Sequence, residues 1–104
     1  MKLLDLVVKE FITIVEFLAQ TQPVEKNRIV IERELFRKLL EKYGFMKFNQ
    51  KTKVYKTLNF VIHDKNNYTM PYKDTVSKKA VRKVIINYEA YTTIKHLYET
   101  DANL

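Results

Sequence analysis

The alternation of apolar and polar positions at the start of the chain predicts a helix over residues 3–20. The polar positions recur at steps of three or four, which places them on one narrow stripe of a helix. They are Asp5, Lys9, Thr13, Glu16 and Gln20. The apolar arc around this stripe is wider than that of an ordinary surface helix. We therefore expect this helix either to be the centre of a small core or to dock another chain with part of its arc.

Two lines of large side chains follow that arc. Phe11, Val15 and Leu18 lie on one line, and Leu6 and Phe17 lie on the other. One line can face the core, whereas the other would stay exposed in a monomer, and such apolar patches mark interfaces. The pattern predicts contact with a second copy or with another protein, and the candidate interface residues are Leu6, Phe11 and Phe17.

Shorter patterns predict a strand and a second helix after a loop that contains proline. Residues 28–31 form a β-branched run that is typical of a short strand. Residues 32–43 return to helical spacing. Gly44 is the only glycine of the chain, and we expect it to end this helix in the left-handed conformation.

A third helix is expected from Asn49, which would cap it, to Asn59. The helical repeat of about 3.6 residues separates two sides of this helix. Val54, Tyr55 and Leu58 fall on the apolar side. The opposite side is polar and positively charged, and it consists of Thr52, Lys53, Lys56 and Thr57.

The following segment predicts a hairpin with a basic tip. Residues 64–67 have the composition of a turn. Two strands are expected over residues 68–73 and 81–88, joined by the polar stretch of residues 74–79. Pro71 has no N–H to donate to a neighbouring strand, so we expect the first of these strands at a sheet edge.

Residues 89–99 predict a last amphipathic helix, and residues 100–104 a frayed tail. A chain of 104 residues has the size of one domain, and its apolar share of 46% lies in the globular range. We therefore expect a single, mostly helical α+β domain over residues 1–104, with the apolar helix at residues 1–20 as its N-terminal part.

Positive charge is concentrated in one segment. Residues 47–83 hold ten basic residues against Asp64 and Asp74, a net charge of +8, whereas the rest of the chain has nine basic and ten acidic residues. A contiguous basic surface is what contact with phosphate requires, and charge that serves solubility alone would be spread more evenly. A solvated lysine-rich face is the alternative interpretation.

The order of these elements resembles that of a winged helix-turn-helix domain over about three quarters of the chain. The likeness is carried by residues 35–45 as the first helix of the motif, Gly44 at its turn, residues 49–59 as the recognition-like helix and residues 68–88 as the wing. Residues 53–58 followed by 61–65 are similar to the exit from the third helix into the wing. The resemblance implies a winged-helix core over residues 28–88, with an extra N-terminal helix and a C-terminal helix. It also implies a role like that of replication or accessory proteins of phages, plasmids and mobile elements.

Cationic side chains on the third helix and the hairpin can follow the phosphates of a nucleic acid. The candidate contacts are Lys51, Lys53, Lys56, Thr57, Lys65, Lys73, Lys78, Lys79, Arg82 and Lys83. Few side chains here are of the types that read bases, so we expect weak sequence preference for duplex or single-stranded DNA. Tyr55, Tyr68 and Tyr72 lie between the lysines and can stack on unpaired bases, although core packing is the alternative for each.

The sequence predicts no catalytic site, no metal and no cofactor. His63 and His96 lack the spacing of metal ligands or of a nucleophile with its base. One glycine cannot form a phosphate-binding glycine-rich loop, and a chain without cysteine fits a reducing cytoplasm. Asp5, Lys9 and Glu10 interrupt the apolar start, so we expect neither a signal peptide nor a membrane span.

Two functions therefore remain open from the sequence. The first is a nucleic-acid-binding module in replication or transcription control of a phage or mobile element. The second is an interaction protein, such as an accessory subunit or inhibitor of a polymerase, helicase or other nucleic-acid enzyme. The second would use the N-terminal helix to form a homodimer or a complex with a larger protein.

Overall fold

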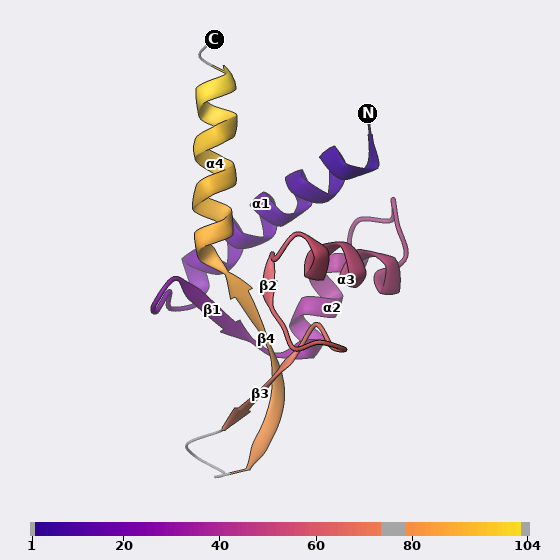
Figure 1. Ribbon diagram of the computed structural model, residues 1–104, viewed down its shortest axis with the longest axis vertical. Coiled ribbons are helices and arrows are strands. Elements are labelled where there is room, and N and C mark those ends of the chain that lie inside the picture. The colour runs from indigo at the N-terminus through magenta and orange to yellow at the C-terminus, as the bar shows by residue number, and fades with distance from the viewer. Residues whose placement is uncertain (1, 74–78, 103–104) are drawn as a thin grey trace.

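The computed structural model describes residues 2–73 and 79–102, with side chains through residue 99. Four helices and four strands are present in this part of the chain (Figure 1). They are α1 (Leu3–Thr21), β1 (Arg28–Ile31), α2 (Arg33–Glu41), α3 (Phe48–Thr57), β2 (Val61–Ile62), β3 (Met70–Lys73), β4 (Ala80–Asn87) and α4 (Tyr88–Ala102). The expected α+β class is confirmed. The tip of the hairpin, residues 74–78 with Lys78, lies outside the described residues.

The strand β4 is the centre of the sheet. It pairs with each of the other strands, always antiparallel, and the order across the sheet is β1-β4-β2, with β3 also on β4. The registers place Ile31 opposite Val84, Val61 opposite Ile86 and Met70 opposite Lys83. Within the described residues β3 pairs with β4 alone, so the edge position expected from Pro71 is confirmed.

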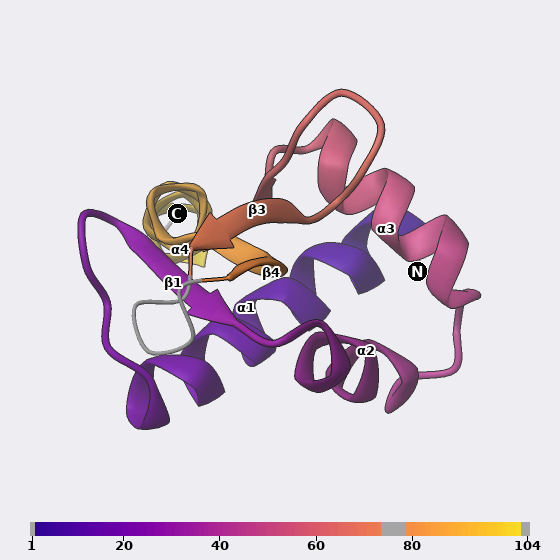
Figure 2. The ribbon, with the colours of Figure 1, turned by 90° about the horizontal axis from the view of Figure 1, so that it is seen from below.

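Residues 63–69 leave the sheet between β2 and β3. Val61 and Met70 are nine positions apart, whereas their partners on β4, Ile86 and Lys83, are only three positions apart. The two short strands therefore pair with successive parts of β4, and the loop between them arches outward beside α3 (Figure 2). This loop contains the residues by which the separation of Val61 and Met70 exceeds that of their partners on β4.

The helix α1 runs through the middle of the molecule, flanked by β1, α2 and α3 (Figure 2). Phe11, Val15 and Leu18 are fully buried, and the ring of Phe11 stacks on that of Phe60 with centroids 3.9 Å apart. The interpretation of α1 as the centre of the core is confirmed for this line of residues, and the prediction of Phe11 as an interface residue is wrong. Leu6 is half-buried, and Phe17 is 48% exposed.

The boundaries of α2 and α3 differ from those expected. Gly44 does not adopt a positive φ, so it is not a left-handed stop, whereas Asn59 does, at 57°, just beyond the end of α3. The helix α3 begins at Phe48, so the prediction of Asn49 as its cap is wrong. The ring of Phe48 packs edge-on against Phe36, which draws this residue into the first helical turn.

The helix α4 follows β4 directly and extends away from the rest of the molecule, at the end opposite the hairpin (Figure 1). Its first half is held to α1, because Tyr91 and Lys95 both donate hydrogen bonds to the Glu16 carboxylate. These bonds, with Lys95 first, lower the pKa of Glu16. Leu97 and Tyr98 lie beyond this contact and are 58% and 41% exposed.

The last helix is also longer than expected. It runs from Tyr88 to Ala102, so a frayed tail beginning at residue 100 is wrong, and residues 103–104 lie outside the described residues. No helix in the described part of the chain has both the length and the apolar composition needed to cross a membrane.

Candidate nucleic-acid interface

The helix α3 turns one polar side outward, as the sequence predicted. Asn49, Lys53 and Thr57 are exposed, and Lys56 is partly exposed. Thr52 was expected on the same side but is buried, and its hydroxyl donates a 2.9 Å hydrogen bond to the Asn49 carbonyl one turn earlier. The outward side is therefore narrower than predicted and consists chiefly of the two lysines and Asn49.

Lys51 does not lie on that surface, because its side chain is fully buried. The Nζ donates 2.6 Å hydrogen bonds to Glu10 Oε2 on α1 and to the Leu40 carbonyl, and a further bond to the Tyr43 carbonyl. It also lies 4.2 Å from the centroid of the Phe45 ring. All three ammonium protons have acceptors, so the prediction of Lys51 as a nucleic-acid contact is wrong.

Tyr55 completes this buried network. Its hydroxyl donates a 2.8 Å hydrogen bond to Glu10 Oε1. Burial, assisted by the neighbouring carboxylate, raises the pKa of Tyr55 far above its usual range, so the phenol stays neutral. Burial also raises the pKa of Glu10, while hydrogen bonds from Lys51 and Tyr55 offset part of that rise. Tyr55 is fully buried, so its predicted stacking on bases is wrong.

The position of Lys51 also explains why Gly44 is not the stop that was expected. The last carbonyls of a helix need partners, which a left-handed residue commonly provides by redirecting backbone N–H groups. Here the Lys51 ammonium provides these partners at the end of α2, because it donates hydrogen bonds to the carbonyls of Leu40 and Tyr43. A cation there also complements the negative end of the helix dipole.

The loop of residues 63–69 is held by Asp64. Its Oδ1 accepts hydrogen bonds from the backbone N–H groups of Asn66 and Asn67, at 3.1 and 2.9 Å, which confirms the predicted turn. Its Oδ2 accepts a 2.5 Å bond from Arg82 on β4, and Arg82 donates further bonds to Thr69. The bond from Arg82 lowers the pKa of Asp64. Arg82 therefore ties the loop to the sheet, although it was predicted as a phosphate contact.

A hollow of about 260 Å³ lies between α3 and this loop. The residues that line it are Asn49, Thr52, Lys53, Lys56, Asn66, Asn67 and Tyr68. Two of them are lysines and none is acidic. Within the described residues, the ammonium groups of Lys53 and Lys56 have no hydrogen-bond or ion-pair partner. The hollow is therefore a concave, positively charged surface with amide groups on both walls.

Tyr68 lines that hollow and also lines a second one. The second hollow, of about 270 Å³, is lined by Arg33, Glu34 and Arg37 of α2 together with Tyr68. Sequence reasoning did not select these arginines, because they lie before the basic segment of residues 47–83. Only the fold brings α2 beside the loop.

The described part of the hairpin carries fewer exposed cations than expected. Lys83 forms a 2.8 Å ion pair with Glu32, and its Nζ lies 5.5 Å from the centroid of the Tyr72 ring. Tyr72 is 40% exposed. Lys65, Lys73 and Lys79 are exposed, as a contact surface requires. The described part of the hairpin therefore keeps Lys73 and Lys79 as candidates.

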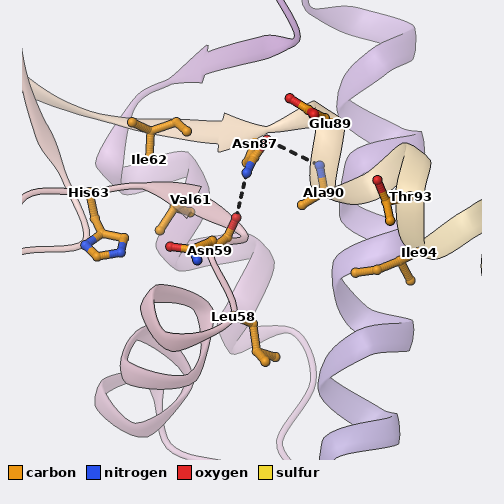
Figure 3. Close-up of a pocket in the computed structure, with 10 residues that line it drawn as sticks. All are labelled: Leu58, Asn59, Val61, Ile62, His63, Asn87, Glu89, Ala90, Thr93 and Ile94. Atoms are coloured by element: carbon orange, nitrogen blue, oxygen red, sulfur yellow. Dashed lines mark hydrogen bonds between the residues drawn. The ribbon is translucent and has the colours of Figure 1, made fainter.

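A larger hollow, of about 710 Å³, separates the start of α4 from the end of α3 and β2 (Figure 3). Asn87 lines this hollow and forms two hydrogen bonds. Its side-chain amide donates a 2.8 Å hydrogen bond to the Asn59 carbonyl, and its Oδ1 accepts a 3.3 Å hydrogen bond from the Ala90 N–H. His63 lies at its rim, and its Nδ1 is 2.8 Å from the Asp64 carbonyl. In the described residues no three His, Cys, Asp or Glu side chains gather as a metal site.

No model of a known protein family matches this sequence, and no curated protein matches it either.

Proposed function

We propose that this protein is a non-enzymatic nucleic-acid-binding protein of winged-helix type. The observation that carries the proposal is the hollow beside α3, which Lys53 and Lys56 line and which has no acidic lining residue. Phosphate oxygens are the partners that such lysines bind in nucleic-acid-binding proteins. We propose binding rather than catalysis because the hollow presents cations and amide groups, which hold phosphates and bases.

The topology supports the winged-helix assignment. In order along the chain, α1, β1, α2, α3, β2 and the β3–β4 hairpin follow the sequence of elements of such domains, with the order β1-β4-β2 across the sheet. In this reading α3 is the recognition helix and the hairpin is the wing. The helix α1 then belongs to the domain itself, since its buried line forms part of the core.

The test is a set of equilibrium titrations of the full chain against labelled DNA at several salt concentrations. Neutralised phosphates release counterions, so log affinity should fall linearly with log salt, with a slope of about 0.7 to 0.9 per contact. Non-specific competitor DNA should displace the label. An affinity that stays constant between low and moderate salt would refute phosphate binding.

A second candidate function is supported by a separate observation. Several large apolar side chains are exposed on the two terminal helices: Leu3, Leu4 and Phe17 on α1, and Leu97 and Tyr98 on α4. Exposed apolar residues of this size favour a protein partner, either a second copy or a nucleic-acid enzyme that this protein assists or inhibits. The two functions are compatible, because these residues lie on elements other than α3 and the hairpin.

The biological setting that we propose comes from the winged-helix resemblance alone. It is replication or transcription control of a phage or mobile element, in the cytoplasm. The absence of cysteine is consistent with a reducing compartment.

A further inference from the structure

The two hollows beside α2 and α3 meet at one aromatic ring. Tyr68 lines both of them, and it belongs to the loop of residues 63–69 that Asp64 and Arg82 hold in place. Its ring lies 5.7 Å from the centroids of both Phe36 and Phe48, stacked on the first and edge-on to the second. The ring is therefore fixed by packing, while Tyr68 as a residue is only partly buried.

Cations lie on both sides of this ring. Lys53 and Lys56 line the hollow on the α3 side, and Arg33 lines the one on the α2 side together with the acidic Glu34. Arg37 also lines the second hollow, but its Nε donates a 2.6 Å bond to Glu41. In the described part of the chain Arg33 forms no ion pair, so it is the guanidinium available on that side.

The shape of this surface bears on which nucleic acid it can hold. A helix that enters the major groove of a duplex presents a convex face to the base edges. Here the loop of residues 63–69 rises beside α3 and makes the outward side of the helix one wall of a hollow (Figure 2). A concave, basic surface with a fixed aromatic ring is the arrangement that holds unpaired bases and the phosphates between them.

We propose that this surface binds single-stranded nucleic acid in preference to duplex. The strand crosses Tyr68, with one base packed on the ring, phosphates at Lys53 and Lys56 on one side, and a phosphate at Arg33 on the other. The inference rests on the proposed nucleic-acid binding and adds to it the class of ligand and two residues, Tyr68 and Arg33, that bind it.

The experiment compares three labelled probes by fluorescence anisotropy with the full chain. They are an oligothymidine of about a dozen nucleotides, an oligouridine of the same length and a DNA hairpin with the same number of phosphates. We expect both single strands to bind at least about tenfold more tightly than the hairpin at equal salt. A difference between oligothymidine and oligouridine identifies DNA or RNA as the source of the strand.

Two pairs of variants test the residues. Tyr68→Leu should weaken single-strand binding about 5- to 150-fold through lost stacking, while Tyr68→Phe, which keeps the ring, should bind as the unmodified protein does. Arg33→Gln should lower affinity and reduce the salt slope by about 0.7, the value for one contact to a single strand. Lys38→Gln is its matched control, because it removes one charge from an exposed position of α2 outside both hollows.

The outcomes separate the two proposals. If the hairpin binds as tightly as the single strands, and neither Tyr68→Leu nor Arg33→Gln changes single-strand affinity, the preference for single strands is wrong and the proposed function stands. If no probe binds even at low salt, the proposed function fails as well. Because Tyr68 packs on Phe36 and Phe48, Tyr68→Leu is checked by its melting temperature, and Arg33→Gln decides the question if that variant does not fold.

Discussion

Lys51 on α3 and Glu10 on α1 form an ion pair 2.6 Å long in which both side chains are buried. Every polar atom of the pair has a partner, since Tyr55 bonds the second carboxylate oxygen and the ammonium also donates to the carbonyls of Leu40 in α2 and Tyr43 just beyond it. The pair joins three helices at one point. It fixes the position of α3, with Lys53 and Lys56 on its outer side, relative to the core.

Removing one member of this pair should be strongly destabilising. We expect Lys51→Met to lower the free energy of unfolding by about 3–5 kcal/mol, because the Glu10 carboxylate is left buried without its cation. Urea denaturation of the purified protein measures this loss. The double variant Glu10→Met with Lys51→Met leaves no uncompensated charge and should be more stable than Lys51→Met alone. Losses that simply add in the double variant would contradict the coupling.

The outward lysines should behave in the opposite way. Lys53→Glu combined with Lys56→Glu should weaken nucleic-acid binding but change stability by no more than about 0.5 kcal/mol, because neither ammonium has a partner among the described residues. Anisotropy titrations and a thermal melt of the same sample measure both effects. Lys38→Glu with Lys42→Glu, at exposed positions outside the hollow, is the matched control and should retain more of the affinity.

Acid should weaken the attachment of the loop to the sheet. Arg82 lowers the pKa of Asp64 in the folded protein below its ordinary value of 3.8. The ionised carboxylate therefore contributes stability that is fully present above that value and is lost as the pH falls through the lowered pKa. When the pH is lowered from neutral to about 3, the free energy of unfolding should fall less in the Asp64→Asn variant than in the unmodified protein. Urea midpoints at the two pH values test this, and equal losses in both proteins would show that the ion pair has no part in acid stability.

Two phenylalanines of α1 offer a matched comparison of core and surface. Phe11→Ala should cost about 3–5 kcal/mol of folding free energy, since Phe11 is fully buried and stacked on Phe60. Phe17→Ala removes a side chain that is 48% exposed and should cost far less. Chemical denaturation provides both values.

The same exposed ring tests the second candidate function. If Phe17 takes part in self-association, Phe17→Lys should give a folded protein with a weaker tendency to dimerise in sedimentation velocity runs over a range of concentrations. A protein that is monomeric at every concentration, with or without the change, would exclude the homodimer.

Local patterns predicted most elements, because the periodicity of apolar positions in a helix or strand depends on residues that are close together in the sequence. The strand at Arg28–Ile31 was predicted to the residue, and the strands of the hairpin were predicted to within one or two positions. Boundaries failed where a distant residue decided them. The end of α2 depends on Lys51, and the start of α3 depends on the packing of Phe48 against Phe36.

The candidate site was predicted only in part. Charge density in the sequence selects Lys53 and Lys56, which do lie on the outer side of α3, but it also selects Lys51, which is buried. A signal against Lys51 was present, since it falls on the same side of α3 as Tyr55 and Leu58 at steps of four and three. A lone cation on an apolar side indicates a buried acidic partner, and Glu10 is the acid inside the apolar arc of α1. Arg33 had no such signal, because only the fold brings it beside Tyr68.

The central position of β4 in the sheet affects how this protein unfolds locally. Every other strand is bonded to β4 and, in the described residues, none of β1, β2 and β3 is bonded to another. Backbone amides of all three strands are thus protected from hydrogen exchange by one common partner. When β4 detaches, the whole sheet loses its protection together, so amides far apart in the sequence should exchange with deuterium as one cooperative unit. The amides at the far end of α4, beyond its contact with Glu16, should exchange much earlier.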